Sequence, residues 1–151
     1  MLKCLLPVSV ALAGNITVTV SPATRPILRR GRVAARGAAE AFAEASPGDD
    51  LGKTDAGWES FVLSVAQSTI AAWSGDGVTD GDAVADVTPE NIAALLSLDG
   101  PFDAFVAKVI NPATVADAEK NASAPLSAGS TPATAPTATS ALPASATAAT
   151  A

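Results

Sequence analysis

The sequence contains no histidine and no tyrosine, and its 151 residues include a single cysteine, Cys4. Without histidine, a Ser-His-Asp triad, a histidine general base and a histidine metal ligand are all excluded. One cysteine can form neither a disulfide within the chain nor a zinc site built from several thiolates. The serines, threonines and lysines have no identifiable base to activate them. We therefore expect a binding protein, not an enzyme, with no cofactor and no metal.

Charged and aromatic side chains are also missing from the whole C-terminal segment. Residues 121–151 consist mainly of alanine, threonine, serine and proline. Such a segment cannot bury enough apolar area to offset the entropy lost when it becomes ordered. The overall hydrophobic fraction of 48% overstates the core, because alanine inflates it. We expect residues 121–151 to be a disordered tail, preceded by enough chain for one domain of ordinary size.

The charges that are present are unevenly distributed. The net charge is −6, which argues against nucleic acid as the default partner. Residues 40–119 are mainly acidic, whereas one short block is basic and contains Arg25, Arg29, Arg30, Arg32 and Arg36. A molecule with two oppositely charged ends is suited to self-association or to one charged partner. No apolar run after the first segment is long enough to span a bilayer, so we expect no membrane partner.

The N-terminal segment alternates between apolar and small or polar residues. Two such runs, residues 8–12 and 16–20, are joined by the pair Gly14-Asn15, a pattern typical of a β-hairpin. Lys3 followed by the mainly apolar residues 4–14 also resembles a short secretory signal peptide that would be cleaved after Ala13. We favour a hairpin over residues 1–20, because a cleavage site does not require the second alternating run.

Helical periodicity and capping residues predict four helices, over residues 21–46, 54–73, 88–99 and 101–111. Thr88-Pro89-Glu90 is a strong helix start, with an N-cap, a proline in the first turn and an acid near the positive end of the helix dipole. Residues 74–87 are expected to form a Gly/Asp loop. The predicted fold is mainly α: a helical domain over residues 21–120 with a short N-terminal β-hairpin and a disordered tail.

Two surfaces are candidates for binding a partner. The first is an apolar stripe at helical spacing, formed by Trp58, Phe61, Val65 and Trp73. This spacing is usually that of a core, but a small domain with two tryptophans can also present a groove for a partner helix. The second is the helix face shared by Arg25, Arg29, Arg32 and Arg36. A solvated or partner-facing side is a better interpretation of this face than a phosphate-binding stripe.

The acidic loop resembles the start of a calcium-binding EF-hand. Asp76, Asp80 and Gly81 fit the first, fifth and sixth positions of that motif. Val78 and Val87 occupy positions at which the motif requires oxygen ligands. The sequence therefore predicts a solvated acidic turn at this point.

Several motifs, taken in order, resemble tail assembly chaperones of long-tailed phages and prophages over residues 15–130. They are Ser21-Pro22-Ala23-Thr24-Arg25, a middle helix ending in Trp73 before the Gly/Asp loop, Val87-Thr88-Pro89-Glu90-Asn91-Ile92, Leu95-Leu96, Phe102-Asp103-Ala104-Phe105 and Glu119-Lys120-Asn121. Ala83-Val84-Ala85 stands where a Gly-Asn-Pro type of turn is expected from this resemblance.

The resemblance implies a function in the host cytoplasm. Such chaperones bind the long helical tape measure protein, keep it soluble and pass it to tail tube protein subunits. Two other interpretations stay open at this point. One is a secreted or periplasmic helical domain with a cleaved signal and a linker-like tail. The other is a minor structural protein of the virion.

Overall fold

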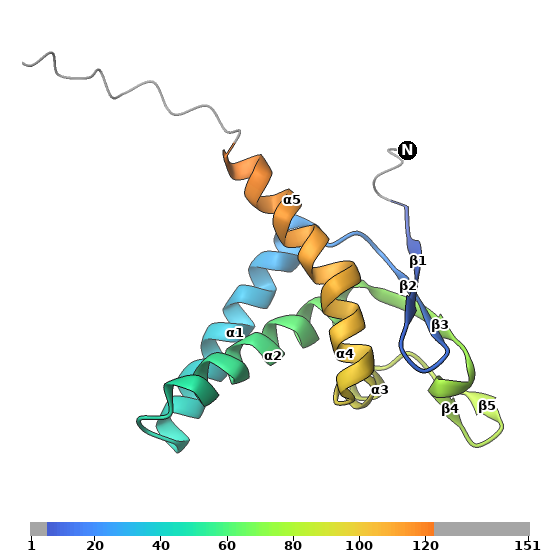
Figure 1. Cartoon of the computed structure of the whole chain (residues 1–151), viewed down its shortest axis with the longest axis horizontal. Coiled ribbons are helices and arrows are strands. Elements are labelled where there is room, and N and C mark those ends of the chain that lie inside the picture. Colours follow the sequence, from blue (N-terminus) through green and yellow to red (C-terminus); the bar gives the residue numbers. More distant parts are fainter. Residues whose placement is uncertain (1–5, 123–151) are drawn as a thin grey trace, which may run out of the picture.

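The computed structural model describes residues 6–122, which form a mainly helical structure with a small sheet on one side (Figure 1). Strands β1 (Val8–Leu12) and β2 (Ile16–Val20) pair as an antiparallel hairpin. Gly14 and Asn15 turn the chain at φ values of 77° and 57°, a region that glycine and asparagine adopt most readily. The predicted hairpin is confirmed. Most of the predicted disordered tail lies outside the described residues.

The sheet has a third strand that the sequence analysis did not predict. β3 (Ile70–Ser74) pairs antiparallel with β2, which gives the strand order β1-β2-β3. The helix expected to continue to Trp73 ends at Thr69, so the prediction was wrong over its last turn. An isolated two-stranded hairpin is only marginally stable, and pairing with β3 supplies the missing neighbour. This tertiary pairing prevails over the helical spacing of the segment.

The expected loop after the sheet also has regular structure. It contains a short 3₁₀-helix, η2 (Asp76–Val78), and a two-stranded ladder of β4 (Thr79–Asp80) with β5 (Ala83–Val84). Gly81 makes the turn between these strands at a φ of 65°. The segment is therefore a small projecting hairpin (β4 and β5, yellow-green in Figure 1) and not an irregular loop.

Helices α1 (Arg25–Ala45) and α2 (Asp50–Thr69) form a closely packed antiparallel pair. Glycines allow this approach: a Cβ atom added at Gly31 would lie 2.9 Å from the Phe61 ring, and one at Gly57 would lie 3.2 Å from the Ala35 carbonyl oxygen. The predicted start of α1 is confirmed. However, α2 starts earlier than predicted, because Asp49 caps it by accepting a hydrogen bond from the Gly52 N–H at 2.9 Å.

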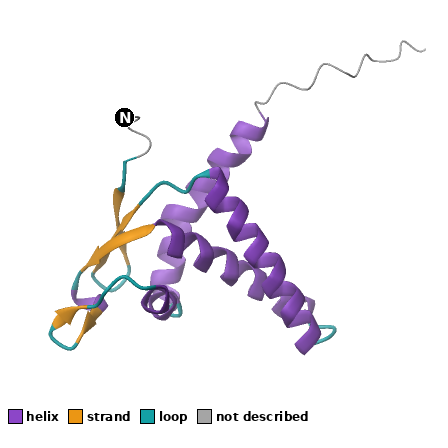
Figure 2. Cartoon of the chain, turned by 180° about the vertical axis from the view of Figure 1, so that it is seen from behind, coloured by secondary structure: helices purple, strands orange, loops and turns teal. Residues whose placement is uncertain are grey.

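As predicted, Thr88 caps α3 (Pro89–Leu96), and its hydroxyl accepts a hydrogen bond from the Asn91 N–H at 3.2 Å. After α3, the chain forms one nearly continuous helical run, which Figure 2 shows from behind. This run consists of α4 (Asp99–Phe105), a π-helical turn η3 (Val106–Ile110) and α5 (Asn111–Ala122). The prediction that the helix ends at Asn111-Pro112 was wrong. The π turn loosens the hydrogen-bond ladder immediately before the proline, and this lets the helix continue.

The core lies where the sheet, α2 and the α4–α5 run meet. Its most deeply buried large side chains come from all these elements and from α1: Val18, Leu28, Val62, Val65, Phe105 and Ile110. In Figure 1 the helical run lies between the α1–α2 pair and the sheet. No described helix is long and apolar enough to cross a membrane.

Candidate functional site: an aromatic groove beside an arginine row

The four residues of the predicted apolar stripe do not share one surface. Val65 is fully buried, and Phe61 is exposed by only 7% of its surface. Trp73 belongs to β3, and its indole Nε1–H donates a hydrogen bond to the Ala85 carbonyl oxygen at 2.6 Å. Trp58, in contrast, is 41% exposed. Of the stripe, Trp58 alone therefore offers a partner substantial aromatic surface.

The Trp58 ring has a fixed support. It stacks on the buried Phe61 ring with centroids 5.7 Å apart and an angle of 19° between the planes. Phe61 in turn packs against Gly31 of α1, where a side chain would clash with the ring. Stacked aromatic pairs are stabilised beyond the area that they bury. A partner would therefore meet a pre-positioned ring, with little side-chain entropy left to lose.

Trp58 lines a shallow, mostly apolar groove of about 370 Å³. Its other lining residues come from α1, α2 and α5: Arg32, Ala35, Thr54, Gly57, Phe61 and Thr114. Gly57 and Ala35 lie where the two helices approach closely, since a Cβ atom at Gly57 would be 3.2 Å from the Ala35 carbonyl oxygen. A hollow of this kind, with an aromatic anchor and a charged rim, fits the side chains of an amphipathic helix. We call it the Trp58 groove.

The predicted arginine face borders this groove. Two of its members hold Asp117 of α5: the Arg32 Nη2 lies 2.7 Å and the Arg25 Nε 3.6 Å from its carboxylate oxygens. Arg25 also donates a hydrogen bond to the Asn121 side-chain oxygen at 2.8 Å. The structure thus brings Arg25 and Arg32 together around one carboxylate, whereas Arg29 is not part of that cluster.

Asp117 is a residue of this cluster that the sequence analysis did not single out. Its side chain is only 7% exposed. The hydrogen bond from Arg32 lowers the pKa of this carboxyl below its ordinary value, and the positive charges of Arg32 and Arg25 act in the same direction, against the effect of burial. The helix-forming composition of residues 113–120 was a signal that could have placed Asp117 on a helix, but Pro112 was interpreted as the helix end.

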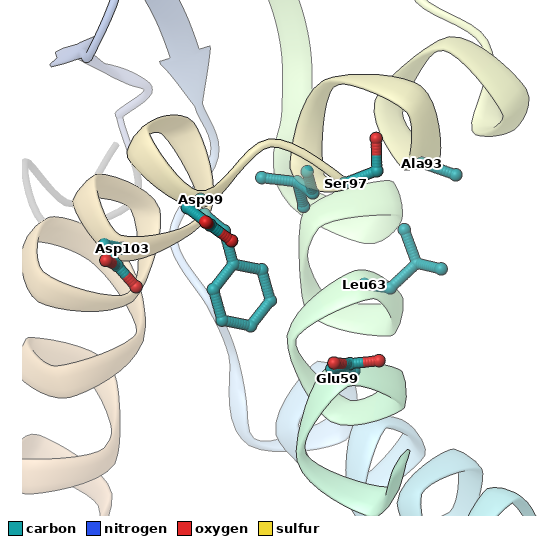
Figure 3. Close-up of a pocket in the computed structure, with 8 residues that line it drawn as sticks. Glu59, Leu63, Ala93, Ser97, Asp99 and Asp103 are labelled. Atoms are coloured by element: carbon teal, nitrogen blue, oxygen red, sulfur yellow. The ribbon is translucent and has the colours of Figure 1, made fainter. Parts of the chain in front are cut away.

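A second pocket of about 520 Å³ lies on another side of α2 (Figure 3). Glu59 and Leu63 project into it from α2, while Asp99 and Asp103 come from α4.

Among residues 6–122, no group of three or more histidine, cysteine or acidic side chains is arranged to hold a metal ion. In the acidic turn that resembles the start of an EF-hand, the Asp76 carboxylate accepts a hydrogen bond from the Asn15 side-chain amide at 3.3 Å.

Comparisons of the chain with protein-family models, curated proteins and solved structures find no match. The resemblance to tail assembly chaperones therefore depends on the sequence motifs alone.

Proposed function

We propose that this protein is a tail assembly chaperone of a long-tailed phage or prophage. In this proposal it acts in the host cytoplasm, binds helical segments of the tape measure protein, keeps them soluble and promotes their transfer to tail tube protein. It catalyses no reaction and requires no cofactor. Two lines of reasoning support the proposal: the order of the sequence motifs, and a groove suited to an amphipathic helix.

One observation carries the binding part of the proposal. Trp58 is 41% exposed although it stacks on a buried ring, and it sits in a groove with apolar walls. Tryptophan is the residue type most enriched among the anchors of protein interfaces, where its truncation typically costs about 2 kcal/mol or more of binding free energy. Self-association, which the uneven charge distribution predicts, is a separate hypothesis.

The test is co-expression with the tape measure protein encoded nearby. The wild-type chain should raise the soluble yield of that protein, and Trp58→Ala should reduce the yield, because about 2 kcal/mol corresponds to roughly a thirtyfold loss of affinity. Leu51→Ala is the matched control: Leu51 also lies on α2 and is 74% exposed, but it does not line the groove. Phe61→Ala is unsuitable, since truncating a buried phenylalanine typically destabilises the fold by about 3–5 kcal/mol.

Three outcomes would contradict the proposal. If the wild-type chain solubilises no tape measure protein, the chaperone function is wrong. If mass spectrometry finds the chain in purified virions, the protein is a structural component of the virion and not a chaperone. An intact mass lacking residues 1–13 would favour the secreted alternative, and cleavage there would remove strand β1 together with its buried Leu12.

A further inference from the structure

The α1 arginine row already holds one helix-borne carboxylate. Asp117 on α5 lies against Arg25 and Arg32, which are about two helical turns apart on α1. The two guanidinium groups approach the same carboxylate, one oxygen each. Within the fold, this face of α1 therefore already binds an acidic residue on a neighbouring helix.

Arg29 and Arg36 repeat the same spacing about one turn further along α1. At about 100° per residue they lie on the same side of the helix, rotated about 40° further toward solvent. Both are exposed, and neither has an ion pair or a side-chain hydrogen bond within residues 6–122. In particular, Arg36 does not pair with Glu40, although Glu40 lies on the next turn.

This second arginine pair lies about one helical turn from Arg32, the charged residue that lines the Trp58 groove. Arg29 is three residues before Arg32 and Arg36 is four residues after it, so the three side chains are neighbours on the surface of α1. A helix placed in the groove would therefore have its apolar side chains on Trp58 and one polar flank beside Arg29 and Arg36. Because arginine side chains are positively charged, a carboxylate on that flank gains charge-assisted hydrogen bonds, whereas a basic residue is repelled.

We infer that Arg29 and Arg36 bind a carboxylate on the helix that occupies the Trp58 groove. The partner segment is thus an amphipathic helix with an aspartate or glutamate along one edge of its apolar stripe. This inference rests on the proposed function in one respect, namely that a partner helix occupies the groove. It adds which chemistry selects that helix.

Two synthetic helical peptides test the inference directly. Both carry the same leucine and alanine stripe, and one has glutamate along one flank where the other has glutamine. Fluorescence anisotropy of labelled peptides should show that the full-length protein binds the glutamate peptide roughly three- to tenfold more tightly. The preference should shrink as salt is raised, because the arginine pair is exposed to solvent.

Variants of the protein assign the preference to particular side chains. Arg29→Gln combined with Arg36→Gln should remove the preference for the glutamate peptide while leaving the melting temperature unchanged. Arg30→Gln is the control, because Arg30 lies on a different side of α1 and is also exposed. It should retain most of the preference, although it lowers the net positive charge of the helix.

Equal binding of the two peptides, no binding of either, or equal losses in the Arg30 and Arg29/Arg36 variants would each overturn the inference. Its failure is distinguishable from failure of the chaperone function. If the Arg29/Arg36 variant solubilises the tape measure protein as well as wild type while Trp58→Ala does not, the inference fails and the function stands. If wild type has no chaperone effect but the peptide preference holds, the arginine pair recognises acidic helices in another context.

Discussion

The contact between Gly31 and the buried Phe61 ring tests how α1 and α2 pack. Replacing Gly31 with alanine puts a Cβ atom 2.9 Å and 3.0 Å from two carbons of the Phe61 ring and 3.2 Å from a Val65 methyl group. Phe61 and Val65 are both buried, so neither can move away without disturbing its neighbours. Overpacking of this kind typically costs about 1–3 kcal/mol.

A helical alanine also gains stability over glycine, so a control is needed. Gly37→Ala provides it, because Gly37 lies on the same helix and a Cβ atom there would meet nothing within 4 Å. Both substitutions gain about 1 kcal/mol from helix propensity. That gain makes Gly37→Ala stabilising by about 0.5–1 kcal/mol and leaves Gly31→Ala neutral to about 2 kcal/mol destabilising.

The difference between the two variants is the informative quantity, since the propensity term cancels. It should be about 1–3 kcal/mol in free energy of unfolding by urea denaturation. For a domain of this size it corresponds to about 4–12 °C between the two melting temperatures. If Gly31→Ala proves as stable as Gly37→Ala, α1 and α2 do not pack through Phe61, and the support assigned to Trp58 would be lost with that contact.

Two further predictions concern the cap of α3 and the acid sensitivity of α5. Thr88→Ala should lower the free energy of unfolding by about 1 kcal/mol, as measured by urea denaturation, because the hydroxyl that accepts the Asn91 N–H is removed; no change would mean that this cap is not formed. The pKa of Asp117 is lowered in the folded state, so its contribution to stability is present above its ordinary pKa and is lost as the pH falls through the folded value. Asp117→Asn should therefore be less stable than wild type at pH 7 and lose that deficit in acid, and a deficit that persists unchanged at low pH would show that the carboxylate charge is not responsible.

Local chemistry was sufficient to predict the features in which a few neighbouring residues decide the backbone. Gly14-Asn15 determines the turn of the hairpin, and Thr88-Pro89 determines the start of α3. Such signals depend on the φ preferences of single residues and on one or two local hydrogen bonds, so the residue types alone indicate them. Helix α1 begins at Arg25, within four residues of the predicted start, with a proline in its first turn but no hydrogen bond from the Thr24 side chain.

The features that were missed depend on contacts between distant segments. The spacing of Trp73 fits a helix, but β2 pairs with this segment and makes it a strand. For the same reason, spacing could not tell Trp58 from Phe61. Both lie on the apolar side of α2, and the packing of Gly31 decides which of the two rings is buried. Periodicity thus identifies a face, whereas the neighbouring helix selects the residues that remain available to a partner.

The continuation of the last helix through Pro112 links the fold to the candidate site. Thr114, which forms the α5 wall of the Trp58 groove, and Asp117, which the arginine row holds, both lie beyond this proline. A helix that ended at Pro112 would leave the groove with two walls and Arg32 without its carboxylate. The π turn at η3 is therefore the local irregularity on which the site depends, and π turns inside α-helices often occur at functional sites. The segment after Pro112, which the sequence analysis did not predict as helix, therefore supplies the α5 residues of the candidate site.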